Sequence, residues 1–163
     1  MKNADKKTVT CISQDGQKVE VEADKIITRV SAYGILTTDD NVLVIQAHLP
    51  IWEFPGGGNS PKETIHGTLI REFEEETGLI VSPGKLLLEK ENFYVSPSNR
   101  TYHTFQHFFK VKKISGQLLK TSGNLVGARW FPVNELNEKN MNASAFAALQ
   151  TMLYNSSDHQ FLS

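Results

Sequence analysis

The chain has 163 residues, 39% hydrophobic and 21% charged, and its formal net charge at pH 7 is −1. A chain of this length can bury its own core, and its balanced charge provides no basic surface for a nucleic-acid polymer. The single cysteine, Cys11, excludes an internal disulfide and any zinc site built on several thiolates. We therefore expect one domain over residues 1–163 that binds no nucleic-acid polymer.

The first residues contain lysines but no apolar run of the kind that follows them in a signal peptide. Nowhere does an apolar stretch approach the length that a membrane-spanning helix needs. These features predict a cytoplasmic location and no membrane partner. The sequence leaves open whether the protein is a monomer or a homodimer.

Residues 1–25 predict a β-hairpin extension, because TVTCIS and KVEVEA alternate around the turn signal Asp15-Gly16. The next two strands are predicted over residues 26–38 and 42–47, with a tight turn at residues 39–41. Residues 48–63 contain Pro50, Pro55 and three consecutive glycines, which predict an irregular loop.

A helix is predicted over residues 61–77. Ser60 serves as the expected N-cap, Pro61 suits the first helical position, Glu63 completes a capping box, and Gly78 provides a left-handed stop. Strands are then predicted over residues 85–90, 101–113 and 127–133, followed by an amphipathic helix over residues 143–154. This order predicts a mixed α/β fold.

The segment REFEEETG, residues 71–78, places four carboxylates within one and a half helical turns. Like charges three and four residues apart on a helix repel, so the segment lowers helix stability unless a cation offsets the repulsion. Helical spacing lets Glu72, Glu75 and Glu76 converge, whereas Glu74 points elsewhere. Arg71 lies four residues before Glu75 and can pair with it. Carboxylate oxygens are ligands that Mg²⁺ and Mn²⁺ prefer.

These residues resemble the Nudix box, G-x5-E-x7-R-E-U-x-E-E-x-G-U, at every fixed position from Gly57 to Leu79. The resemblance implies a Nudix α/β/α sandwich with a mixed β-sheet, to which the hairpin adds an N-terminal extension. It also implies hydrolysis of the pyrophosphate bond of a nucleoside diphosphate linked to another group. In this family the metal ligands would be Glu72, Glu75, Glu76 and the backbone carbonyl of Gly56, and Arg71 would orient the glutamates. The implied cofactor is Mg²⁺, with Mn²⁺ as the other possibility.

The general base stays open at this point. Many relatives of the MutT type place a glutamate where this chain has Asn124, and an amide does not accept a proton at neutral pH. Glu75, a water molecule held by Glu76, or Glu91 are the remaining candidates.

The resemblance implies a small nucleotide as substrate, and the segment WEFPGG is similar to the one that leads into the box of MutT-like enzymes. That similarity implies a nucleoside triphosphate with an oxidised purine, with Phe54, Arg100 and Asn142 as substrate-binding residues. Each also has a simpler structural reading, as core, turn or helix-cap residue. Two alternatives remain: an ADP-ribose or dinucleoside polyphosphate pyrophosphatase, suggested by Tyr94, and a non-catalytic nucleotide sensor.

Overall fold

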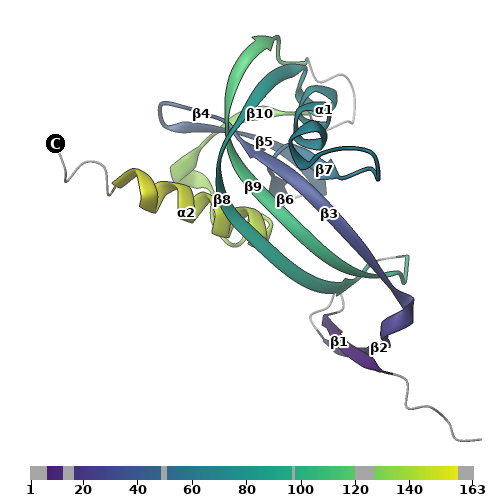
Figure 1. Cartoon of the computed structure of the whole chain (residues 1–163). Coiled ribbons are helices and arrows are strands. Elements are labelled where there is room, and N and C mark those ends of the chain that lie inside the picture. Colours follow the sequence, from purple (N-terminus) through teal and green to yellow (C-terminus); the bar gives the residue numbers. More distant parts are fainter. Residues whose placement is uncertain (1–6, 13–16, 49–50, 97, 120–126, 158–163) are drawn as a thin grey trace, which may run out of the picture.

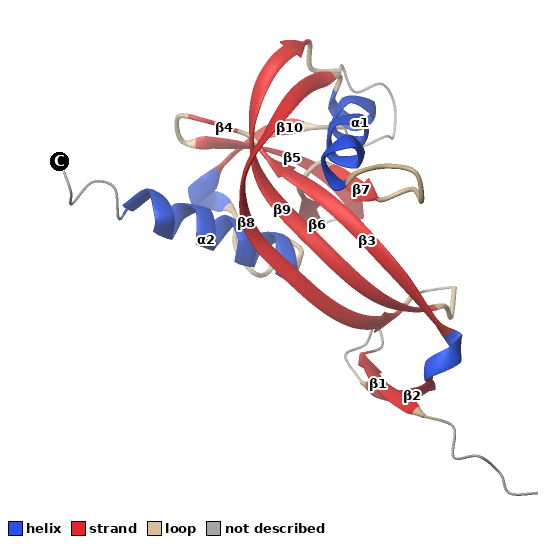
Figure 2. Cartoon of the chain, viewed as in Figure 1, coloured by secondary structure: helices blue, strands red, loops and turns tan. Residues whose placement is uncertain are grey.

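The computed structural model describes residues 7–12, 17–48, 51–96, 98–119 and 127–157. Figures 1 and 2 show long, curved strands with one helix on either side. The helices are α1 (Ile65–Thr77) and α2 (Ala143–Ser157), with short 3₁₀ turns at Ala23–Lys25 and Val133–Glu135. The strands are β1 (Thr8–Ile12), β2 (Lys18–Glu22), β3 (Ile26–Ile35), β4 (Thr37–Thr38), β5 (Asn41–His48), β6 (Ile51–Glu53), β7 (Gly56–Gly58), β8 (Leu79–Val95), β9 (Thr101–Gly116) and β10 (Arg129–Pro132).

The larger sheet has six strands in the order β2-β1-β8-β9-β3-β7, and it is mixed. Strands β8 and β9 pair antiparallel, β9 and β3 pair parallel, and β3 and β7 pair antiparallel. A second sheet has the order β10-β5-β4, with β6 paired to β5. The predicted α/β/α sandwich with a mixed sheet is confirmed.

Two hydrophobic clusters hold these layers together. One joins α2 to the sheets through buried residues such as Phe108, Val44 and Leu149. The other lies under α1, where Leu69 and Phe73 are completely buried. Because each strand points successive side chains to opposite faces, neighbours such as Phe108 and Phe109 belong to different clusters. Within the described ranges, neither helix is long and apolar enough to cross a membrane.

The hairpin predicted near the N-terminus is present, since β1 and β2 pair antiparallel from Thr8↔Glu22 to Ile12↔Lys18. Its expected turn at Asp15-Gly16 lies outside the described residues. The hairpin joins the main sheet at Ile12↔Tyr94, at the end of the long strands that is remote from α1 in Figure 1.

The helix of the box begins later than its sequence suggests. Its N-cap is Thr64, whose hydroxyl oxygen accepts a hydrogen bond from the Gly67 N–H at 3.0 Å, and not Ser60. Residues 60–63 instead form a turn, closed by the Glu63 N–H and the Ser60 carbonyl at 2.9 Å. Both Ser60 and Thr64 are suitable caps, and the contacts of Glu63 described below select the second. The end of the helix is as predicted, with Gly78 in the left-handed conformation at φ 75°.

The loop predicted over residues 48–63 also contains two short strands, β6 and β7. Strand β7 consists of glycines alone, and local sequence gives no reason for a strand there. It forms because β3 offers a free edge, against which Gly56, Gly57 and Gly58 pair with Tyr33, Ala32 and Ser31. A long-range contact therefore determines this element.

Candidate active site

Two glycines let the carboxylates of α1 approach the backbone of β7 closely. A Cβ atom on Gly57 would lie 2.6 Å from the carboxylate carbon of Glu72, so no larger residue fits there without a shift. The N–H of Gly56 donates a hydrogen bond to Glu76 Oε2 at 2.8 Å. Gly56 has φ +150°, and a Cβ atom there would lie 2.1 Å from the Ala32 carbonyl oxygen. The site is therefore built on direct contact between a helix and a glycine strand.

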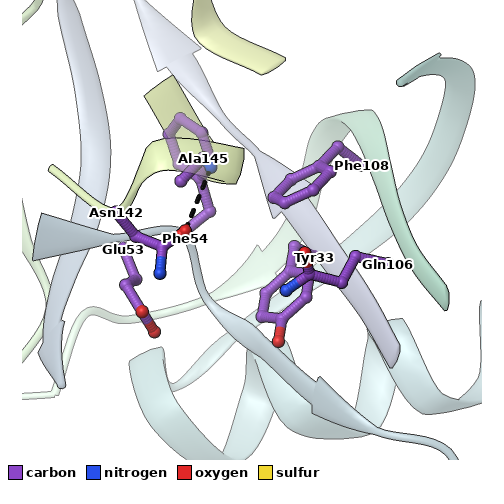
Figure 3. A pocket seen from close by; sticks show the side chains of 7 residues that line it. All are labelled: Tyr33, Glu53, Phe54, Gln106, Phe108, Asn142 and Ala145. Carbon is purple, nitrogen blue, oxygen red and sulfur yellow. Dashed lines mark hydrogen bonds between the residues drawn. The ribbon is translucent and has the colours of Figure 1, made fainter. Parts of the chain in front are cut away.

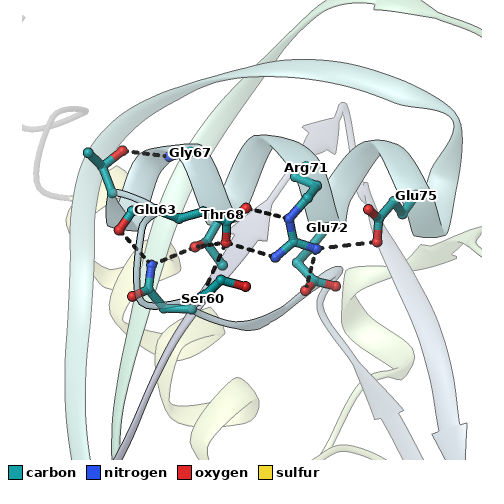
Figure 4. Close-up of polar contacts among 9 residues, drawn as sticks. Ser60, Glu63, Gly67, Thr68, Arg71, Glu72 and Glu75 are labelled. Atoms are coloured by element: carbon teal, nitrogen blue, oxygen red, sulfur yellow. Dashed lines mark hydrogen bonds and ion pairs between the residues drawn. The ribbon is translucent and has the colours of Figure 1, made fainter.

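Arg71 is the centre of an ion-pair network at the start of this site (Figure 4). Its Nε and second terminal nitrogen donate to the two oxygens of Glu63 at 2.6 and 3.0 Å. Its other terminal nitrogen donates to Glu72 at 2.8 Å and to Glu75 at 3.3 Å. The fork geometry of a guanidinium suits this two-point contact with a carboxylate. Arg71 therefore contacts three glutamates, and the predicted pairing with Glu75 is present.

Glu63 makes the contact with the Ser60 N–H that the predicted capping box requires, although the helix itself begins later, and it has further partners. Its carboxylate accepts hydrogen bonds from the Ser60 N–H at 3.2 Å and from the Thr68 hydroxyl at 3.0 Å, as well as from Arg71. These contacts, the one with Arg71 first, lower the pKa of Glu63 to about 2. Glu63 is therefore a fixed anion that holds Arg71 in place.

Glu76 lies in the opposite electrostatic environment. Its pKa is raised to about 7, chiefly because burial removes its carboxyl group from water. Repulsion by Glu72, Glu53 and Glu75 acts in the same direction, and the hydrogen bond from Gly56 opposes it. At the C-terminal part of the helix, Glu76 is therefore a buried carboxyl group among like charges.

The oxygen donors of this site suit a hard divalent cation. Glu72 and Glu76 both lie against the β7 backbone, whereas the side chain of Glu75 is 59% exposed and reaches only Arg71. In the part of the chain that the structure describes, no three His, Cys, Asp or Glu side chains are already grouped as a metal site. Mg²⁺ commonly uses only one or two carboxylates and completes its shell with water and substrate phosphate, so the donor set fits such an ion.

A small pocket of about 10 Å³, with polar and apolar lining residues, lies beside the acidic cluster, and Figure 3 shows its lining. Two of the predicted substrate-binding residues, Phe54 and Asn142, line it together. Phe54 is completely buried, so it forms a wall rather than an exposed stacking surface. The other residues of the lining were not predicted from the sequence; they are Tyr33, Glu53, Gln106, Phe108 and Ala145.

Asn142 combines a structural role with a place in this pocket. Its side-chain oxygen accepts hydrogen bonds from the N–H groups of Ser144 at 3.0 Å and Ala145 at 3.4 Å, and thereby caps α2. Because the oxygen is engaged in this way, the amide nitrogen faces the opposite direction, as Figure 3 shows. The pocket therefore has a hydrogen-bond donor at Asn142 and an acceptor at the neighbouring Glu53.

The other predicted substrate residue, Arg100, is not brought to this pocket. It precedes β9 and lines a separate cavity near the hairpin. Thr101 pairs with Ile26, whereas Phe108 of the pocket pairs with Tyr33, seven residues further along β3. At ~3.3 Å per residue, the two places are about 23 Å apart along the strand. Arg100 therefore does not contact a base held by Asn142.

The remaining candidates from the sequence are Glu91 and Asn124 for the general base and Tyr94 for the alternative substrates. Glu91 lies 2.6 Å from His103 Nε2, and Tyr94 stacks on Tyr102 with their ring centroids 5.5 Å apart. These pairs lie in the halves of β8 and β9 that lead toward the hairpin. Asn124, the position in question for the general base, lies outside the described residues.

The family model of the NUDIX domain matches residues 27–152, and the chain belongs to the Nudix family. It is 29% identical over 89 residues to a putative 8-oxo-dGTP diphosphatase from Bacillus subtilis (strain 168), a match that covers 55% of each chain. It is also 29% identical to the putative mutator protein MutT4 from Mycobacterium tuberculosis (strain CDC 1551 / Oshkosh), over 53% of this chain and 34% of the relative. The matches thus span about half and about a third of these curated relatives.

Among solved structures, the chain resembles a MutT protein from Bacillus halodurans with a TM-score of 0.63 and 25% identity. That match covers 75% of this chain and 80% of the other. It supports the sandwich architecture described above.

The missed pocket residues had no separate sequence signal. Tyr33 and Gln106 lie within regular strands, where an aromatic or an amide usually serves packing or solvation. Only the pairing of β3 with both β7 and β9 brings Tyr33 next to Gly56 and Phe108. Glu53 belongs to the segment WEFPGG, whose similarity to MutT-like enzymes drew attention to its neighbour Phe54 instead.

Proposed function

We propose that the protein is a MutT-like Nudix pyrophosphohydrolase, which hydrolyses a purine nucleoside triphosphate with Mg²⁺ or Mn²⁺ as cofactor. The observation that carries the proposal is the contiguity of the acidic cluster and the small pocket. Gly56 donates to Glu76 while it pairs with Tyr33, which lines the pocket. A nucleotide with its base against the mouth of this pocket would therefore extend its phosphates toward the glutamates.

The pocket supports a purine with adjacent donor and acceptor groups. The Asn142 amide can donate to a ring carbonyl, and the Glu53 carboxylate can accept from ring N–H or amino groups. Guanine-type bases carry such a carbonyl and an amino group. Tyr33 and Phe108, which stack with their ring centroids 5.0 Å apart, make the opposite side aromatic. The name of one curated relative, the putative 8-oxo-dGTP diphosphatase from Bacillus subtilis (strain 168), is in keeping with an oxidised guanine nucleotide.

The residues of the chain have distinct parts in the proposed hydrolysis. Glu72, Glu76 and the Gly56 carbonyl would hold the divalent cation, with Glu75 as a further ligand, and Arg71 fixes the orientation of Glu72. When bound, the cation neutralises phosphate oxygens and lowers the pKa of a water molecule for attack on phosphorus. The glycines of β7 allow phosphate to approach the backbone.

A nucleotide panel tests this proposal. We would incubate the protein with 8-oxo-dGTP, dGTP, ADP-ribose or diadenosine polyphosphates, each with Mg²⁺ and with Mn²⁺, and identify the products. The expected result is highest kcat/KM for 8-oxo-dGTP, with nucleoside monophosphate and pyrophosphate as products. Preference for ADP-ribose or a dinucleoside polyphosphate would contradict the substrate assignment. Protection against thermal unfolding by nucleotide, without any product, would instead identify a non-catalytic binder.

A further inference from the structure

A second cavity lies at the hairpin end of the sheet, remote from the box. It has a volume of about 450 Å³ and lies between β2 and the adjoining ends of β3, β8 and β9. Pockets for small molecules are commonly about 300–1,000 Å³ and have a mainly apolar lining with a few polar groups. The size of this cavity, which we call the hairpin groove, is therefore that of a ligand site.

The floor of the hairpin groove is aliphatic. It is formed by Val19 and Val21 of β2, Ile27 of β3 and Val95 of β8. Ile27 is 46% exposed and Val19 is 39% exposed, although both are large hydrophobic residues. Single exposed hydrophobic residues need no explanation, but a concave group of them indicates a surface that something covers.

The charged residues of the groove are basic. Arg100 and Lys25 line it, and no Asp or Glu is among its described lining residues. Lys25 is held by Glu22 at 2.8 Å, which leaves its charge partly compensated. For the Arg100 guanidinium, no carboxylate among the described residues lies within ion-pair distance. The Arg100 N–H donates to the Ser96 hydroxyl at 3.2 Å, so the backbone of this residue is anchored at the groove.

We propose that the hairpin groove binds a small organic anion with an aliphatic body, either a carboxylate or a phosphate monoester. The Arg100 guanidinium binds the anionic head, and the valines and Ile27 cover the aliphatic chain. A guanidinium recognises both head groups through paired N–H donors, so the chemistry is shared. The groove lies about 23 Å along the sheet from the base pocket, and the ligand is therefore distinct from the hydrolysed nucleotide.

Calorimetric titration of the full chain tests the proposal with three matched probes: octanoate, octyl phosphate and 1-octanol. We expect the two anions to bind about tenfold more tightly than the alcohol, as for a hydrogen bond to a charged group. The relative affinity of the two anions distinguishes the carboxylate from the phosphate source. Equal affinity for octanol and both anions would overturn the assignment of the head group.

Two variants separate the head group from the floor. In Arg100→Gln, octanoate should bind as weakly as octanol, whereas Lys85→Gln, an equal loss of charge at an exposed position of β8, should retain anion binding. In Ile27→Gln, all three probes should weaken by a common factor of about five. Ile27 is half exposed, so this variant should fold, which circular dichroism would verify.

Unchanged octanoate affinity in Arg100→Gln would overturn the proposal. So would the absence of binding of every probe to the wild-type chain. The other possible occupant of the groove is a second copy of the chain, and sedimentation velocity tests for it. Self-association that Ile27→Gln abolishes, without anion binding, would make the groove a contact between copies of the chain.

Discussion

The two ends of the box helix use the same residue type in opposite ways. Before the N-terminus of α1, Glu63 is paired with Arg71 at two points, and its pKa is lowered to about 2. Near the C-terminus, Glu76 is buried beside other carboxylates, and its pKa is raised to about 7. The first glutamate is satisfied within the protein, whereas the second has negative neighbours and only a backbone N–H as a described partner.

This difference distinguishes a structural glutamate from a functional glutamate within one motif. A carboxylate whose charge is fully paired stabilises the local structure. A carboxylate whose charge is uncompensated weakens the fold unless a cation binds. Such uncompensated carboxylates are typical of functional sites. Substitutions at four positions test the separate roles of these residues.

The largest effect is expected for Glu76→Gln. The amide side chain retains the hydrogen bond from Gly56 but loses the charge, so we expect kcat to fall by about 10³-fold with the fold intact. The melting temperature should stay the same or rise, because a buried carboxylate among like charges is removed. Steady-state kinetics and thermal melting measure the two effects. Glu74→Gln, on the exposed side of the same helix, is the control, and retained turnover in Glu76→Gln would refute the metal assignment.

The next effect concerns the close approach between helix and strand. Gly56→Ala places a methyl group 2.1 Å from the Ala32 carbonyl oxygen, and we expect a loss of about 3 kcal/mol in the free energy of unfolding. Gly67→Ala is the matched control, since its Cβ atom would meet only the Thr64 hydroxyl at 3.1 Å. Urea denaturation compares them. Equal losses in the two variants would show that the β7 contact is not tightly packed.

Glu63→Gln should reduce kcat/KM by about tenfold or more, since Arg71 would no longer be held in its orienting position. The pH dependence of stability gives a second measure. The pKa of Glu63 is lowered from 4.5 to about 2, so its stabilising effect is present above its ordinary pKa and is lost as the pH falls toward 2. The unfolding free energies of the wild type and Glu63→Gln should therefore converge over this acidic range. A constant difference between them would contradict the pairing with Arg71.

The smallest effect is expected in the base pocket, where two variants of Asn142 separate its roles. Asn142→Asp keeps an N-cap oxygen but removes the amide donor, so KM for 8-oxo-dGTP should rise about fivefold at unchanged stability. Asn142→Ala also removes the cap and should cost about 1 kcal/mol of stability. Unchanged KM in both variants would exclude Asn142 from base recognition.

Much of the box could be predicted because its signals are local. Helical periodicity places Leu69 and Phe73 on the buried face and Glu74 on the exposed one, and a glycine at the end of a helix favours the left-handed stop that Gly78 provides. The start of the helix was predicted incorrectly because two acceptable caps lie four residues apart. The choice between them depends on a contact between Glu63 and Arg71, which lie eight residues apart in the chain.

The base pocket, in contrast, could not be predicted from local signals. Its residues come from β3, β9, the end of β6 and the start of α2, so no sequence window contains them. The resemblance to MutT-like enzymes selected Phe54 and Asn142, which do line one pocket, and Arg100, which does not. The alignment of a short motif cannot show how far along a strand a residue lies from its partner, whereas strand register determines this distance directly.

The amino-acid sequence alone therefore determined the family, the spacing of the carboxylates and most of the elements, because these depend on residues within a few helical turns or one strand of each other. The tertiary structure decided three further features. These are the glycine strand β7, the opposite shifts in the pKa values of Glu63 and Glu76, and the separation of Arg100 from the base pocket. Each depends on which distant segments meet, and burial and charge compensation arise only from that meeting.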